Sequence, residues 1–187
     1  GGTSLDVAGQ RGAVNLMVGL LEEGTGDLDA RGFATARDEL AASFNYSAYD
    51  DAISVSARFL TETQDAAMAL LKGSLVAPSF TDVALKRVRA QVLAGLKSDS
   101  KDPDSIVSQR FDALAFGNHP YGSRAEGTTN SVSALTQDQI RAAHLGTLVR
   151  DRVYASAVGD ITAEQLTTLL DRLLSDLPQS GRPIPSK

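Results

Sequence analysis

The chain contains no cysteine, no tryptophan and only two histidines among its 187 residues. Without cysteine it has no disulfide, no thiolate nucleophile, no iron–sulfur cluster and no cysteine-bound zinc. A cysteine-free chain is compatible with reducing and oxidising compartments alike. The histidines, His119 and His144, stand neither three nor four residues apart, so they form no helical metal-binding pair. We expect His119 to anchor a loop and His144 to pack within a helix.

Basic clusters and long apolar runs are also missing. The 18 Lys and Arg are outnumbered by 23 Asp and Glu, which gives a formal net charge of -5. The densest basic stretch (Lys86, Arg87, Arg89 and Lys97) follows a helical pattern and predicts a solvated helix face. The sequence therefore does not favour nucleic-acid binding, which needs a basic face. No apolar run approaches the roughly 20 residues of a membrane-spanning helix.

Three segments have the pattern of β-strands. Ser43–Tyr49 and Ile53–Phe59 flank Asp50-Asp51, a turn signal, and the second run alternates apolar and polar residues as a half-buried strand does. Val153–Val158 is predicted to form a third strand. Because the first two are adjacent in the chain, they predict an antiparallel pair.

Helices are predicted for seven segments that carry apolar stripes at helical spacing or capping signals. Val107, Phe111 and Leu114 are expected to point inward from one of them. The seven begin or extend as follows: Gly12–Glu23, Ala30–Ala42, Thr61–Leu75, Thr81–Lys97, Asp102–Leu114, a short helix after Thr136 and a last helix after Thr162. The predicted fold class is α+β, an antiparallel sheet with helices packed on one face.

The segment Gly12–Thr25 resembles the signature helix of the insulinase/pitrilysin (M16) family of zinc peptidases. In active members of that family the helix carries His-x-x-Glu-His, followed by a hydrophobic stretch and Gly-Thr. Aligned without a gap, Asn15 stands at the first His, Val18 at the Glu and Gly19 at the second His. Gly24-Thr25 matches the family's Gly-Thr.

The resemblance continues along the chain. Asp6–Gly12 is similar to the family's approach to this helix, Phe44-Asn45 to a family strand, and His119–Gly122 to a frequent family loop. Val158-Gly159-Asp160 resembles the family's final strand and turn. Pro78-Ser79-Phe80 and the charged helix after it resemble the segment that supplies the third zinc ligand, a Glu.

That third ligand falls on Gly95, with Ala94 as the near alternative. Zinc needs nitrogen, oxygen or sulfur donors, and neither Val18 nor Gly19 nor Gly95 has one. The base that would activate water is missing with the Glu at position 18. The resemblance therefore implies an inactive domain with the fold of the M16 and mitochondrial processing peptidases, which binds no metal or other cofactor.

The resemblance also implies partners. Inactive M16 domains pair with an active domain or subunit, or with a second copy, and enclose peptide substrates, so zinc is expected only in the partner. We expect peptide to add to a sheet edge at Asn45, Tyr46, Ser47 and Ala48. Two alternatives stay open: a purely architectural interaction domain like the core subunits of a respiratory complex, and an unrelated α+β binding module.

Domain organisation follows from composition and resemblance together. We expect one M16-like domain over residues 1–177 that lacks its first strand or strands. The Pro-rich residues 178–187 predict the start of an interdomain linker. Many bacterial relatives are exported, which favours the periplasm or another exported location, while the cytoplasm stays open.

Overall fold

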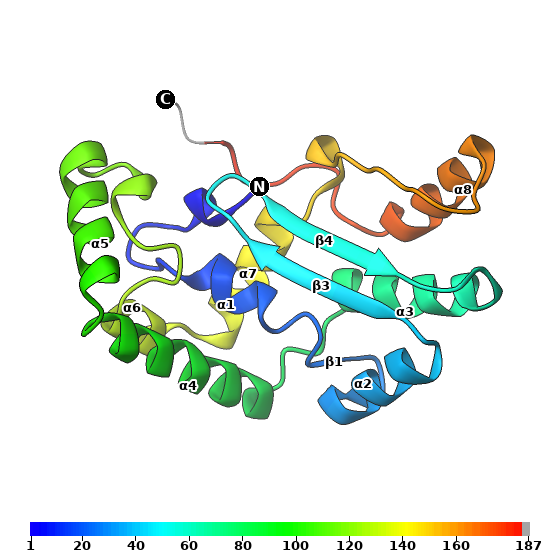
Figure 1. Cartoon of the computed structure of the whole chain (residues 1–187), viewed down its shortest axis with the longest axis horizontal. Coiled ribbons are helices and arrows are strands. Elements are labelled where there is room, and N and C mark those ends of the chain that lie inside the picture. Colours follow the sequence, from blue (N-terminus) through cyan, green and yellow to red (C-terminus); the bar gives the residue numbers. More distant parts are fainter. Residues whose placement is uncertain (185–187) are drawn as a thin grey trace.

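The computed structural model describes residues 1–184 and has the predicted α+β class. A two-stranded antiparallel hairpin, β3 (Ser43–Ala48) and β4 (Ile53–Arg58), lies over α1 (Ala13–Val18) and the helices around it, as Figure 1 shows. Its register pairs Ser43 with Arg58 and Ala48 with Ile53. The prediction of an antiparallel sheet with helices on one face is confirmed.

The hairpin forms where alternation in the sequence requires it. Phe44 is buried, Tyr46 and Val55 pack against the core, and Ser47 and Ser54 point to the opposite, exposed face. One face of the hairpin therefore closes the core while the other faces solvent, as period-2 patterning predicts.

The N-terminal third departs from the predicted helix over residues 12–23. After η1 (Thr3–Leu5), α1 ends at Val18, and Leu20 and Leu21 are fully buried in the turns that follow. A short hairpin of β1 (Gly24–Thr25) and β2 (Leu28–Asp29) then leads into α2 (Ala30–Glu39). The apolar residues after Gly19 keep the chain buried, but they do not continue the helix.

The remaining helices surround this centre (Figure 1). Capping boxes at Thr136 and Thr162 start two of the predicted helices, whereas Thr61, the predicted start of a third, lies in a 3₁₀ turn before the helix begins at Gln64. The helix α6 was not predicted from the sequence. The elements are η2 (Thr61–Thr63), α3 (Gln64–Val76), α4 (Asp82–Asp99), α5 (Pro103–Phe116), η3 (Pro120–Gly122), α6 (Thr129–Ala134), α7 (Gln137–Thr147), η4 (Arg150–Arg152) and α8 (Ala163–Leu174).

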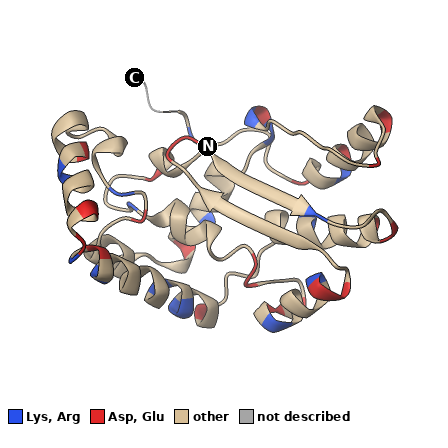
Figure 2. Cartoon of the chain, in the orientation of Figure 1, with Lys and Arg blue, Asp and Glu red and all other residues tan. Residues whose placement is uncertain are grey.

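The core is built around α1. Val14, Leu16 and Met17 are completely buried, between α7 on one side and β3 and α4 on others. Figure 2 shows acidic and basic residues interspersed along the helices rather than separated by sign. No helix within residues 1–184 is both long and apolar enough to cross a membrane.

The predicted strand Val153–Val158 is not formed. The segment carries no strand assignment, and no backbone hydrogen bond joins it to any other part of residues 1–184. Tyr154 and Val158 are fully exposed. The apolar–polar pattern is that of a strand, but a strand needs a neighbour for its N–H and C=O groups, and the described residues supply none.

The predicted orientation of α5 is also wrong. Val107, Phe111 and Leu114 were expected to point inward, but their exposed fractions are 67%, 66% and 74%. No residue of α5 is buried. The helix packs mainly on η3 through its other side, so its apolar stripe faces solvent.

Candidate functional site

The start of α1 is fixed by one buried carboxylate. Asp6 accepts hydrogen bonds from the backbone N–H of Gly12 at 2.8 Å and of Val14 at 2.9 Å. It thereby satisfies two of the free N–H groups at the helix N-terminus. Gly12 has φ of 95°, and a Cβ there would lie 2.4 Å from the carbonyl oxygen of Glu126, so the position requires glycine.

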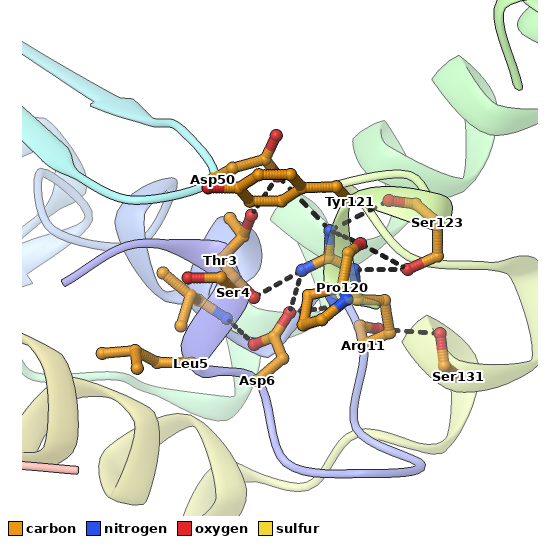
Figure 3. A network of polar contacts seen from close by, with 12 residues as sticks. Thr3, Ser4, Leu5, Asp6, Arg11, Asp50, Pro120, Tyr121, Ser123 and Ser131 are labelled. Atoms are coloured by element: carbon orange, nitrogen blue, oxygen red, sulfur yellow. Dashed lines mark hydrogen bonds and ion pairs between the residues drawn. The ribbon is translucent and has the colours of Figure 1, made fainter. Parts of the chain in front are cut away.

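Arg11 joins this helix start to two distant loops, as Figure 3 shows. Its side chain is only 14% exposed, and its guanidinium forms ion pairs with Asp6 and Asp50, each at 3.5 Å. It also donates to the Ser123 hydroxyl and to three carbonyl oxygens, those of Thr3, Pro120 and Ser123. The network holds the N-terminus, the β3–β4 turn and η3 together around the start of α1.

The electrostatics of this network are those of a structural clamp. Burial raises the pKa of Asp6, while the hydrogen bonds from Val14 and Gly12 and the charge of Arg11 act in the opposite direction. Tyr121 donates to Asp51, and that hydrogen bond raises the pKa of the phenol. These groups are engaged with one another, so the network positions the start of α1.

The three motif positions lie along α1 and at its C-terminal cap. Asn15 is half-buried, Val18 is buried with 5% exposure, and Gly19 is the C-terminal cap. A Cβ at Gly19 would lie 3.0 Å from Cγ1 of Val88 on α4. The structure therefore brings the signature helix against the helix that carries the third motif position, as the resemblance implies.

The third position itself is open. Gly95 and its neighbour Ala94 are exposed on α4, and no atom lies within 4 Å of a Cβ built on Gly95. Gly95 is seven residues beyond Val88, which is about two helical turns. Space for a side chain exists there, but the residue supplies no donor.

The side chains present do not fit a zinc ion. Val18 packs in the core and Gly19 has only backbone, so Asn15 would be the single side-chain donor, and one amide oxygen cannot hold zinc. Within residues 1–184 no three His, Asp or Glu side chains converge on a point where a metal could bind. The residues at these positions therefore do not support a zinc-dependent step.

Both histidines have the structural roles predicted for them. His144 is buried in α7, its Nε2 lies 2.7 Å from the carbonyl oxygen of Leu75, and its ring meets Phe80 edge-on. Burial lowers its pKa more than this hydrogen bond raises it. His119 accepts a hydrogen bond from the Tyr121 N–H and so shapes the η3 loop.

The side chains of the expected peptide-binding strand alternate between more buried and exposed positions. The Tyr46 hydroxyl lies 2.6 Å from the Ser74 hydroxyl, and burial raises the pKa of Tyr46 to about 12. Asn45 and Ser47 are exposed, and Ala48 is half-buried. Among residues 1–184, β3 pairs only with β4, so its outer edge keeps backbone groups without a strand partner.

Together the fold and the motif positions define a class: an α+β domain built like a zinc peptidase, without the zinc ligands. The family model described as Insulinase (Peptidase family M16) matches residues 2–129. The chain therefore belongs to the insulinase, or M16 peptidase, family.

Individual relatives agree with this assignment. The chain is 31% identical over 179 residues to the non-peptidase homolog YmxG of Helicobacter pylori. The aligned region covers 96% of this chain and 41% of that protein. A solved peptidase M16 inactive domain from Pseudomonas fluorescens superposes with a TM-score of 0.93 at 24% identity, covering 100% of this chain and 45% of that one. The first half of the periplasmic protease PqqL of Escherichia coli gives a TM-score of 0.80 at 17% identity, with 42% of that chain covered.

The chain thus spans less than half the length of these relatives. The likeness to a non-peptidase homolog and the residues without donor groups at the ligand positions both favour a non-catalytic M16 domain. We call the network of Arg11 with Asp6, Asp50 and Ser123 the Arg11 clamp, and it was not predicted from the sequence. The Asp-x₅-Gly spacing before the signature helix is the sequence signal that could have identified Asp6.

Proposed function

We propose that this chain is a non-catalytic M16 domain that pairs with an active zinc-peptidase domain or subunit and helps to enclose its peptide substrates. One observation carries the proposal: the position of the general base holds Val18 and two zinc-ligand positions hold Gly19 and Gly95, and none of these three side chains has a donor group. A domain that keeps the fold without the catalyst retains surfaces for binding, so its role is to hold a partner and peptide.

The first test measures zinc content and peptidase activity of the purified 187-residue chain, with an M16 peptidase that has an intact His-x-x-Glu-His motif as the positive control. We expect no stoichiometric zinc and no hydrolysis of an unfolded peptide. Stoichiometric zinc together with hydrolysis contradicts the proposal.

The second test is purification of the natural protein from its source. An active His-x-x-Glu-His chain that co-purifies, or the same motif elsewhere in the same polypeptide, supports the proposed role. Recovery in a membrane complex without any such motif favours the architectural alternative.

The outer edge of β3 is the proposed peptide site, over Asn45, Tyr46, Ser47 and Ala48. The Tyr49 N–H donates to the Ala52 carbonyl, which makes these two a hydrogen-bonded pair. Alternation along an antiparallel ladder then directs the N–H and C=O groups of Tyr46 and Ala48 outward, where an added strand would bind them.

A proline at position 48 tests this edge. Ala48→Pro removes an outward N–H without removing a bond to β4. We expect it to abolish the chemical-shift or exchange changes that an extended, unfolded peptide causes along β3. Ser54→Ala, at an exposed position of the neighbouring strand β4, is the control and should bind as the unaltered chain does. Equal binding by both variants contradicts the assignment of the edge.

The proposal extends to the domain organisation of the chain. Residues 1–177 are one domain, and a strand from outside these 187 residues pairs with Val153–Val158, whose backbone has no partner in residues 1–184. The proposed linker starts at 178; Pro178, Gln179 and Arg182 still form backbone hydrogen bonds with residues 146–151, and 185–187 lie outside the described residues. Slower amide exchange at 153–158 in a longer natural chain is the expected result.

The proposed location is the periplasm or another exported compartment. It is supported by a structural relative that is a periplasmic protease, PqqL, and by a cysteine-free chain that tolerates an oxidising environment. Fractionation of the source cells tests it, and recovery of the protein with cytoplasmic markers contradicts it.

A further inference from the structure

The helix α5 is turned with its apolar side away from the molecule. Val107, Phe111 and Leu114 are at positions i, i+4 and i+7, and so lie within roughly 60° of one another at about 100° per residue. We call these three residues the α5 ridge. Each is about two-thirds or more exposed, and Figure 1 shows α5 at one end of the molecule, beside α4 and far from α8.

The inner side of the same helix is polar. Ser105, Ser108, Gln109 and Asp112 line a hollow together with residues of the loop after η3, among them Arg124. A surface helix normally buries its apolar stripe and exposes its polar face. In α5 the apolar stripe is exposed and the polar face turns inward. This arrangement suits a helix that lies between this domain and a second protein surface from outside the described residues.

We propose that the α5 ridge is the docking surface for the active M16-type partner domain. The inference rests on the proposed function and identifies the part of the surface that would contact the partner. Exposed aromatic and aliphatic residues gathered on one surface mark protein interfaces, whereas isolated ones do not. The ridge spans about 10 Å along the helix axis, a length suited to one helix crossing.

Two observations favour a protein domain as the occupant. This chain matches 41% of YmxG and 45% of the Pseudomonas protein. More than half of each relative therefore lies outside the matched part. The ridge is bordered by Asp104 and Arg110, and the whole chain has a formal net charge of -5, which does not favour an anionic lipid surface. An apolar centre with charged borders is typical of domain interfaces.

The test compares variants of the 187-residue chain for binding to an M16-type polypeptide of the same source that carries an intact His-x-x-Glu-His motif. Phe111→Gln with Leu114→Gln removes the centre of the ridge and keeps good helix formers. Val83→Gln changes an equally exposed apolar residue, at 78% exposure on α4, and is the matched control.

We expect the double variant to raise the dissociation constant at least about 30-fold, as the loss of a buried aromatic anchor does, and the control to change it less than about threefold. Hydroxyl-radical footprinting gives a second readout, because oxidation of Phe111 should slow in the complex while oxidation of Val83 should not. Circular dichroism confirms that both variants fold.

Three outcomes overturn the inference. Binding of the double variant at unchanged affinity overturns the ridge as the docking surface and leaves the proposed function intact. If the unaltered chain does not bind, and its own polypeptide carries no His-x-x-Glu-His motif elsewhere, the inference and the proposed function are both overturned. A dimer of the chain alone that the double variant abolishes, measured by sedimentation equilibrium, assigns the ridge to a second copy and so contradicts an M16 partner of the active type.

Discussion

Gly19 of the signature helix lies directly against Val88 of α4: a Cβ on Gly19 would stand 3.0 Å from Cγ1 of Val88. In the family pattern, position 19 carries a zinc-binding His and α4 carries the third ligand. The close approach of the two helices is therefore retained, but it is filled by a valine methyl group. A zinc-binding His at position 19 therefore requires Val88 to move.

This relationship sharpens the test of the alignment. Asn15→His, Val18→Glu, Gly19→His and Gly95→Glu together restore the motif, but His at 19 must displace Val88. We expect weak zinc binding by this variant, tighter binding when Val88→Ala is added, and no efficient cleavage by either without a partner. Zinc per folded chain is measured by atomic emission after dialysis. If both variants fold and neither binds zinc, the alignment of the four positions is wrong.

The two motif glycines should respond oppositely to alanine. Gly95 is inside α4 with open space around it, so Gly95→Ala should raise the free energy of unfolding by about 0.5–1 kcal/mol through helix propensity. Gly19→Ala should lower it by about 1 kcal/mol because the methyl group meets Val88.

A denaturant titration of each variant checks both values. Adding Val88→Ala to Gly19→Ala provides the control, since the penalty at Gly19 should then disappear as a coupling between neighbours. Additive effects of the two changes contradict the contact.

The limits of sequence-based prediction in this chain have a common physical origin. Patterns local to the chain were sufficient for the hairpin around Asp50-Asp51 and for the helices that begin after Thr136 and Thr162. The prediction was wrong where a pattern depends on a neighbour that the described residues do not supply. Val153–Val158 alternates like a strand and the α5 ridge repeats like a core face, but neither finds its partner within residues 1–184.

The Arg11 clamp could not be predicted for a different reason. It joins residues more than 100 positions apart, Arg11 and Ser123, through side-chain and carbonyl groups that have no periodicity. Only the folded chain brings them together.

Removing the carboxylate of Asp6 should destabilise the domain strongly. Asp6→Ala leaves the N–H groups of Gly12 and Val14 without their acceptor and removes one of the two carboxylates that pair with the buried Arg11. The loss of one member of a buried ion pair costs about 3 kcal/mol or more. Asp38→Ala is the control, because its pair with Arg37 is largely exposed and should contribute less than about 0.5 kcal/mol. Equal losses of unfolding free energy in urea contradict the role of the clamp.

His144 should make the stability of the domain depend on pH. Burial lowers its pKa from the ordinary value of 6.5, so at acidic pH the unfolded chain binds a proton before the folded chain does. The stabilising contribution is therefore complete above about pH 6.5 and is lost as pH falls through the lowered pKa. His144→Gln keeps a donor for the Leu75 carbonyl but does not titrate. We expect the difference in unfolding free energy between the original chain and this variant to shrink as pH falls from 7.5 to 5, measured by urea titration at each pH. A difference that stays constant or grows contradicts a buried neutral imidazole, since His119 and the carboxylates are common to both chains and cancel.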